Sequence, residues 1–317
     1  MKTLLAFIVC FAAAAQAQDY PSKPIRLIVA TAPGGLMDVP ARLMADYFEK
    51  AYGQRLVVEN KGGAGGVMAG DTVAKAAPDG YTLAVIQVGN VAINPFIVKH
   101  MPFDPLKDLA PVAPLTSSPV VVTISASLPA KDLREFIALA RREPGKLNYG
   151  TAGPGTIPHL SGELFSQVAG VRLTPVHYRG AGPALADLLA GQVQAIFVGL
   201  GVVHAQAAAG KVRILAVSQA SRLRAAPDIP TAAEAGLPGF EINTWFGVVA
   251  PHGTPEPIVS LLNREIHTML DDPAVRARLM AGGLEPLKET PQEFGARMRR
   301  DHERYEPIIK AAGLARQ

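Results

Sequence analysis

Short apolar runs alternate with amphipathic stretches along the N-terminal third of the chain. The runs at residues 25–30, 56–59 and 81–87 have the length and composition of buried strands. The stretch after the first run has a helical pattern, because its apolar side chains recur on one face: Val39, Leu43, Met44 and Tyr47. Strands and helices that alternate in this way, with glycine-rich segments between them, predict a parallel α/β architecture.

The same design returns further along the chain. Residues 120–124, 147–149 and 174–177 resemble strands, and residues 132–142 form an amphipathic helical pattern. From Thr254 onward the pattern is mainly helical. One apolar stripe in this part is assigned to the core: Ile258, Leu261, Leu262, Ile266 and Leu270.

A proline-rich segment separates the two halves. Residues 100–119 contain five prolines, and this change of composition predicts a domain crossing near Ser117. A strand-like run ending at Ser218 predicts the return crossing. The predicted organisation is a first lobe of residues 18–117 plus 219–317 and a second lobe of residues 118–218.

The first residues have the three parts of a secretory signal peptide. Lys2 precedes an apolar run at residues 4–15, and the small-residue site Ala15-Gln16-Ala17 predicts cleavage before Gln18. Residues 1–17 are therefore predicted to be a signal peptide, and the mature protein to be periplasmic. The only cysteine, Cys10, lies within this segment, so disulfides and cysteine metal ligands are excluded from the expected mature chain.

The charge of the chain limits the possible binding partners only broadly. The formal net charge is +4 and the pI is about 9.2. The basic residues are scattered, aromatic residues make up only 6% of the chain, and no nucleic-acid-binding motif occurs, so nucleic acid is not an expected partner. A mild positive balance favours small anionic molecules.

The first candidate site is the loop that follows the first predicted strand. Its glycines permit a tight turn with accessible amides, Asp38 is a candidate N-cap, and the positive end of a helix dipole would lie at the loop. Such a loop favours an anionic ligand, although the same residues also suit a plain turn. The candidate residues are Pro33, Gly34, Gly35, Leu36, Met37 and Asp38.

Further polar candidates follow other strand ends, where parallel α/β sheets bind ligands. Gln87 and Asn90 follow the third strand, although capping explains Asn90 equally well. A second glycine-proline loop begins at Gly150 and again precedes an amphipathic helix. The second candidate set offers hydroxyls, amides, a histidine and an arginine: Thr151, Gly153, Gly155, Thr156, His159 and Arg179. Arg179 suits clamping a carboxylate or pairing with a structural acid, and capping or packing is the alternative role of His159.

Motifs for catalysis are missing from the sequence. Gly-x-Ser-x-Gly, His-Glu-x-x-His and His-x-His patterns do not occur, and no metal or cofactor is expected. The glycine-rich run from Gly63 to Gly66 is followed by Met68 where a dinucleotide fingerprint requires its third glycine. No Walker lysine follows any glycine run.

Several motifs, in order along the chain, resemble one known family. The motifs are Pro33-Gly34-Gly35 with Asp38, Pro78-Asp79-Gly80-Tyr81, Tyr149-Gly150-Thr151 with Gly155-Thr156 and His159, Tyr178-Arg179-Gly180, Asp187-Leu188-Leu189-Ala190-Gly191, and Trp245-Phe246-Gly247. They look like those of the Bug (TctC-type) solute-binding proteins of tripartite tricarboxylate transporters. The resemblance covers essentially the whole mature chain.

This resemblance implies a two-lobed α/β periplasmic binding protein of type II topology, with its ligand cleft between the lobes. It also implies that the loops at residues 33–38 and 151–156 hold a ligand carboxylate, partly through bridging waters. Delivery to the large and small membrane subunits of a permease would follow. We expect a monomer, and binding without catalysis.

The sequence departs from the family pattern at the expected pocket. Leu36-Met37 replaces a small or polar pair, and Val198 follows Phe197 where relatives often have a polar residue. These changes predict a monocarboxylate or dicarboxylate with an apolar or aromatic body as ligand. Two alternatives remain open at this point: an enzyme that uses Asp38 or His159 as acid or base, and a sensor that signals to a membrane receptor.

Overall fold

The computed structural model describes residues 20–31, 33–62 and 64–316. The predicted signal peptide, with Cys10, lies outside these residues. Within them, no helix combines the length and the apolar character needed to cross a bilayer.

In the described part of the chain, ten strands form one continuous sheet. Eight of them follow the spatial order β2 (Leu56–Asn60), β1 (Ile25–Val29), β3 (Thr82–Gln87), β9 (Asn243–Pro251), β4 (Leu109–Ser125), β7 (Ala195–Gly199), β5 (Asn148–Thr151) and β6 (Thr174–His177). Two more strands pair with β4, namely β8 (Val212–Val217) and β10 (Glu285–Pro286). Strand β1 is parallel to β2 and β3, and β5 is parallel to β6 and β7, so each end of the sheet has the predicted parallel α/β character.

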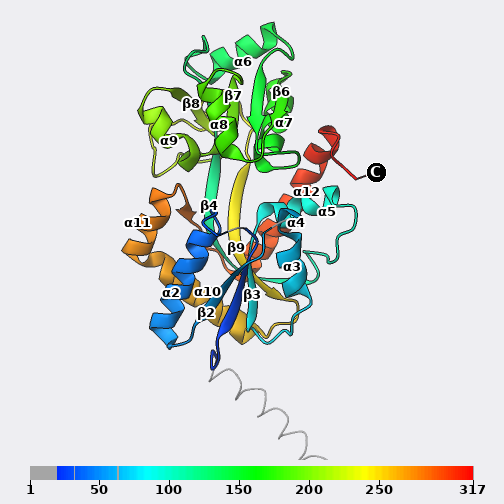
Figure 1. The fold of residues 1–317 in the computed structure, drawn as a ribbon, viewed down its shortest axis with the longest axis vertical. Helices are drawn as coiled ribbons and strands as arrows, with labels where there is room; N and C mark the ends of the chain where they lie inside the picture. The colour runs from blue at the N-terminus through cyan, green and yellow to red at the C-terminus, as the bar shows by residue number, and fades with distance from the viewer. Residues whose placement is uncertain (1–19, 32, 63, 317) are drawn as a thin grey trace, which may run out of the picture.

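The long strand β4 belongs to both ends of the sheet. Residues 109–119 pair with β9, and residues 120–125 pair with β7. Figure 1 shows β4 and β9 running side by side through the middle of the molecule, between a part that carries α6 to α9 and a part that carries α2, α3, α10 and α11. Ser117, near which the sequence predicts a crossing, lies inside β4. The strand tolerates prolines because its register with β9 shifts after Pro111 and after Pro114.

The helices cover the faces of the two sheet ends. Their bounds are α2 (Asp38–Tyr52), α3 (Val67–Ala74), α4 (Val88–Ala92), α5 (Asn94–Ile97), α6 (Leu133–Arg142), α7 (Ile157–Ala169), α8 (Ala181–Leu189), α9 (Leu200–Ala208), α10 (Glu256–Asp271), α11 (Pro273–Ala281) and α12 (Pro291–Ala311). A short 3₁₀ turn, η1 (Ala64–Gly66), precedes α3. The stripe predicted on α10 is largely core, since Leu262, Ile266 and Leu270 are fully buried.

The segment after β8 packs against α7 and β7 before the chain enters β9. The return crossing that the sequence predicts near Ser218 stays a prediction. Phe240 lies 5.5 Å from Phe165 of α7 and 6.2 Å from Phe197 of β7, between ring centroids. The chain then passes to the β1–β3 end through β9. This burial of an aromatic side chain holds residues after 218 against α7 and β7.

Candidate functional site

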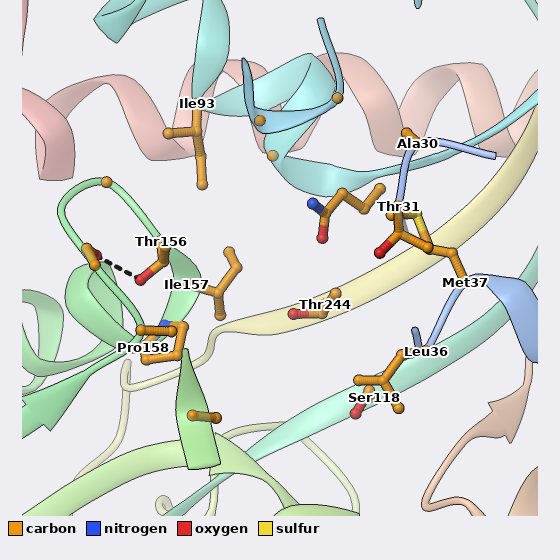
Figure 2. A pocket seen from close by; sticks show the side chains of 18 of the residues that line it. Ala30, Thr31, Leu36, Met37, Ile93, Ser118, Thr156, Ile157, Pro158 and Thr244 are labelled. Atoms are coloured by element: carbon orange, nitrogen blue, oxygen red, sulfur yellow. Dashed lines mark hydrogen bonds between the residues drawn. The ribbon is translucent and has the colours of Figure 1, made fainter. Parts of the chain in front are cut away.

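A cavity of about 1040 Å³ lies where the two ends of the sheet face each other. Its walls come from the β1–α2 loop, η1, the start of α4, and α5 on one side, and from the β5–α7 loop and the end of β7 on the other. Figure 2 shows Thr31 and Met37 across an open space from Thr156 and Ile157, with Thr244 of β9 between them. The predicted strand-end loops thus lie at one cavity.

The residues that the structure places along this cavity are all uncharged. Their polar side chains are hydroxyls and amides: Thr31, Asn60, Gln87, Asn94, Ser118, Thr156 and Thr244. Much of the remaining wall is apolar and includes Leu36, Met37, Ile93, Ile97, Ile157, Val198 and Phe246. The site therefore offers neutral hydrogen-bonding groups around an apolar wall, and this arrangement suits a ligand with a small polar head and an apolar body.

Asp38 supports the first loop from behind. Its Oδ2 accepts hydrogen bonds from the Gly34 amide at 2.9 Å and from Arg42 Nε at 2.8 Å, and its Oδ1 accepts one from Asn60 Nδ2 at 2.9 Å. Burial by itself raises the pKa of the Asp38 carboxyl, but the hydrogen bonds from Arg42, Gly34 and Asn60 outweigh it and hold that pKa below its ordinary value. Asp38 is thus an ionised internal anchor for this loop.

This geometry corrects the expected capping role of Asp38. The N-cap of α2 is Met37, which makes no side-chain capping bond, and Asp38 is the first helical residue. Its carboxylate reaches back four residues and accepts from the Gly34 amide instead. The loop turns at Gly34, whose φ of +79° is a conformation that favours glycine.

The second loop has a similar internal support. Thr156 Oγ1 donates to the Gly153 carbonyl at 2.7 Å, the dashed line in Figure 2. The Gly153 amide donates to Thr151 Oγ1 at 3.1 Å, and the Gly155 amide donates to His159 Nδ1 at 3.1 Å. Thr151 and His159 are buried behind the loop. They therefore shape the loop without facing the cavity.

These bonds correct the expectation of accessible glycine amides. The amides of Gly34, Gly153 and Gly155 donate to Asp38, Thr151 and His159. In each case the acceptor is a buried side chain close in sequence. Gly155 is itself buried, and an unpaired buried amide would be costly there. These three amides are therefore already paired within their own loops. The side-chain hydroxyls and amides of the cavity lining are then the main polar groups available to a ligand.

The candidate residues divide into two groups. Seven line the cavity: Pro33, Leu36, Met37, Gln87, Gly153, Gly155 and Thr156. Seven are not part of its lining: Gly34, Gly35, Asp38, Asn90, Thr151, His159 and Arg179. Asn90 is engaged structurally, since its side chain accepts from the Gln87 amide at 2.9 Å and donates to the Gly65 carbonyl at 2.7 Å. Arg179 is exposed at the end of β6.

Sequence reasoning missed the base of the cavity. Ser118 of β4 and Thr244 of β9 are paired neighbours in the sheet, and both line the cavity. Asn94 also lines it, and its side chain donates to the Gly65 carbonyl at 2.9 Å. Ser118 and Thr244 carry no local signal, because only the pairing of β4 with β9 brings them together. The Asn94-Pro95 helix start was a detectable signal for Asn94.

Potential metal ligands do not cluster in the described part of the chain. Among these residues, no three His, Cys, Asp or Glu side chains form a group that could hold a metal ion. Trp245 is fully buried, donates from Nε1 to Asp301, and does not line the cavity. Its fluorescence therefore follows folding more directly than ligand contact.

Comparison with known proteins identifies the family. Residues 40–314 match the family model of TctC, described as the tripartite tricarboxylate transporter family receptor. The chain is 35% identical to Protein BugT of Bordetella pertussis over 320 residues, which cover 99% of this chain and 98% of the relative.

Two solved structures from Rhodopseudomonas palustris are also similar. One is Rpa4515 with adipate, with a TM-score of 0.81 and 36% identity, covering 94% of this chain and 99% of the other. The second is MatC (Rpa3494) with bound malate, with a TM-score of 0.76 and 35% identity, covering 92% of this chain and 100% of the other. The fold, the cavity between the strand-end loops and these matches lead to one conclusion: the chain belongs to the TctC family of periplasmic solute-binding receptors of tripartite tricarboxylate transporters.

Proposed function

We propose that this receptor captures a small monocarboxylate or dicarboxylate with an apolar body and delivers it to the membrane subunits of a tripartite tricarboxylate transporter. The observation that carries the proposal is the uncharged lining of the cavity. Neutral hydroxyls and amides such as Thr31, Gln87 and Thr156 suit one carboxylate head, and Leu36, Ile97 and Phe246 suit a hydrocarbon body. Relatives solved with adipate and with malate support a carboxylate ligand.

A citrate-like ligand fits this lining less well. Three carboxylates that leave water require opposite charges or several strong donors, because burying an unpaired charge is costly. The described lining contains no cationic side chain, and three of the loop amides are engaged internally. A smaller number of charges, together with an apolar body, is therefore favoured.

The proposal also covers the location of the mature chain and its motion on binding. A cleaved signal peptide at residues 1–17 would bring the mature chain to the periplasm as a monomer. Two lobes that meet along β4 and β9 would close around the ligand, as hinged binding proteins do. Binding without turnover distinguishes this receptor from an enzyme on the same fold: equilibrium dialysis should recover the ligand chemically unchanged.

Thermal shift of the mature protein, residues 18–317, tests the ligand class. The panel contains adipate, malate, an aromatic monocarboxylate such as benzoate, and citrate. A ligand at a hundredfold excess over its Kd adds about 2.7 kcal/mol to the free energy of unfolding. We expect adipate or benzoate to raise the Tm. A panel in which only citrate and other tricarboxylates raise it would contradict the proposal.

A matched pair of variants connects the response to the cavity. Leu36 and Val57 are exposed to similar extents, 47% and 44%, but only Leu36 lines the cavity. Leu36→Glu introduces a negative charge beside the proposed carboxylate and should abolish the thermal response to adipate or benzoate. Val57→Glu, on β2, should keep that response. Equal responses in the two variants would place the ligand elsewhere.

A further inference from the structure

The two cavity loops share one construction. In the first loop, the Gly34 amide donates to the side chain of Asp38, four residues later, at 2.9 Å. In the second, the Gly155 amide donates to the side chain of His159, again four residues later, at 3.1 Å. Both acceptors are buried, with 4% of each residue exposed, and each lies in the first turn of the helix that follows its loop. Each loop is therefore held by one acceptor behind it.

The two acceptors differ in how they respond to pH. A carboxylate such as Asp38 remains an acceptor throughout the neutral and mildly acid range. A histidine accepts through Nδ1 only while this nitrogen carries no proton. The bond from Gly155 thus requires the neutral form of His159, with its proton on Nε2. Glu163 Oε1 lies 3.8 Å from this Nε2.

We propose that His159 is a positioning residue of the ligand site: its neutral Nδ1 holds the Gly155 amide in the binding conformation, and its protonation releases that loop and weakens ligand binding. The expected effect on ligand binding rests on the proposed function, whereas the effect on the loop does not. His159 itself does not line the cavity, whereas Gly155 does. Its effect on the ligand is therefore transmitted through the loop backbone.

The groups around His159 define its titration. Glu163 faces it from α7, the His177 ring of β6 lies 4.8 Å away between ring centroids, and the Tyr149 ring of β5 lies 6.5 Å away. Burial lowers the pKa of His159 below its ordinary value, the charge of His177 lowers it further, and Glu163 opposes both. The neutral acceptor form is thus favoured at neutral pH.

The sign of the pH effect follows from this direction. The unfolded chain takes up the His159 proton near pH 6.5, while the folded chain takes it up at a lower pH. The stabilising contribution of His159 is complete above the unfolded pKa and is lost as the pH falls through the folded pKa. The affinity for the ligand should likewise weaken as the pH falls through the pKa of His159 in the folded chain.

Nuclear magnetic resonance tests the loop without any ligand. Labelling proline carbonyls with ¹³C and glycine amides with ¹⁵N selects the four Pro-Gly amides of the mature chain: Gly34, Gly145, Gly155 and Gly239. Between pH 8 and pH 5, we expect the Gly155 amide shift to follow the His159 ring titration and the Gly34 shift to stay constant. A Gly155 amide that stays constant while the His159 ring titrates would overturn the proposal.

Ligand affinity supplies the second test, with adipate as the probe and calorimetry as the measurement. In His159→Asn the amide oxygen replaces Nδ1 as acceptor but does not titrate. This variant should bind adipate as the original protein does at pH 7.5 and be less weakened at low pH. His159→Leu removes the acceptor and should weaken binding by about tenfold at every pH, the equivalent of one hydrogen bond.

Matched controls separate this effect from others. His267→Asn changes a half-buried histidine on α10 outside the cavity lining and should leave the pH dependence unchanged. The ionisation of adipate is common to all variants. If His159→Asn shows the same pH dependence as the original protein, the proposal is wrong. If adipate binds none of these proteins, the proposed ligand class loses support, and the Gly155 titration still decides the role of His159.

Discussion

Asp38 and His159 shape the cavity although neither side chain lines it. Each is buried, and each accepts a hydrogen bond from a loop glycine. At the scale of single residues, Gly155 and Thr156 thus line the cavity wall, while the acceptors that support the two loops do not line it. Different residues therefore shape the loops and line the cavity.

Removing the Asp38 carboxylate should destabilise the protein. Asp38→Ala leaves the Gly34 amide without its acceptor and removes a hydrogen-bonded partner of Arg42. It also removes one of the two acceptors of Asn60 Nδ2, the other being the Thr31 carbonyl. We expect the free energy of unfolding at pH 7 to fall by about 2–3 kcal/mol, measured by urea denaturation.

The destabilisation by Asp38→Ala should depend on pH, and Asp46→Ala is its control. Because the pKa of Asp38 is lowered in the folded chain, its contribution is present above its ordinary value of 3.8 and is lost as the pH falls through the folded pKa. The difference between the two proteins should therefore narrow in acid. Asp46→Ala changes an exposed carboxylate on the same helix and should alter stability by no more than about 0.5 kcal/mol. Equal effects of the two variants would contradict the anchoring role.

At the scale of elements, helix α12 packs against several elements that line the cavity. It contacts α4, α7 and β4, and His302 Nδ1 lies 2.8 Å from the Val91 carbonyl of α4. Its start is fixed by a capping box: the Glu293 amide donates to Thr290 Oγ1 at 3.2 Å, and the Thr290 amide donates to Glu293 Oε2 at 2.9 Å. Local residues therefore determine where this long helix begins.

Loss of this cap should have a measurable cost. Thr290→Ala removes the hydroxyl that accepts from the Glu293 amide, and we expect the free energy of unfolding to fall by about 1 kcal/mol in urea denaturation. Thr268→Ala is the matched control, because Thr268 is exposed within α10 and its hydroxyl donates to the Arg264 carbonyl within the same helix. That variant should be close to neutral. A control as destabilised as the Thr290 variant would argue against the capping effect.

At the scale of the whole molecule, the two ends of the sheet also meet beside the cavity. A Cβ on Gly201, at the start of α9, would lie 2.7 Å from the Gly282 carbonyl oxygen, in the turn after α11. A Cβ on Gly283 would lie 2.7 Å from the Gly201 amide nitrogen. The backbones approach this closely only because Gly201 and Gly283 have no Cβ. The observed arrangement of the two ends therefore depends on these residues.

Gly201→Val should disfavour this arrangement. The added side chain cannot occupy the space of the Gly282 carbonyl, so the two ends should separate. We expect a larger radius of gyration in small-angle X-ray scattering and an adipate affinity reduced several-fold, because less of the protein is in the binding conformation. Gly182→Ala is the control, since a Cβ at that position on α8 meets nothing within 4 Å. An unchanged radius and affinity in the Gly201 variant would show that the contact does not hold the ends together.

Features that depend on neighbours along the chain were predictable from the sequence. The alternation of strands and helices, the two glycine loops and the helix ends near Gly191 and Gly210 follow from local periodicity and turn chemistry. Motif order indicated the family, which the comparisons confirm. The predicted lobe boundaries and the identity of the ligand-contacting residues stay predictions.

The sequence alone therefore determined the order of the elements, the positions of the two loops and the resemblance to a receptor family. Only the tertiary structure decided that Ser118 and Thr244 meet at the base of the cavity, and that Asp38 and His159 turn towards loop amides. The physical reason is the range of the interactions. Periodicity and turn propensity act over a few residues, whereas strand pairing and the direction of a buried polar side chain depend on donors and acceptors that folding brings together.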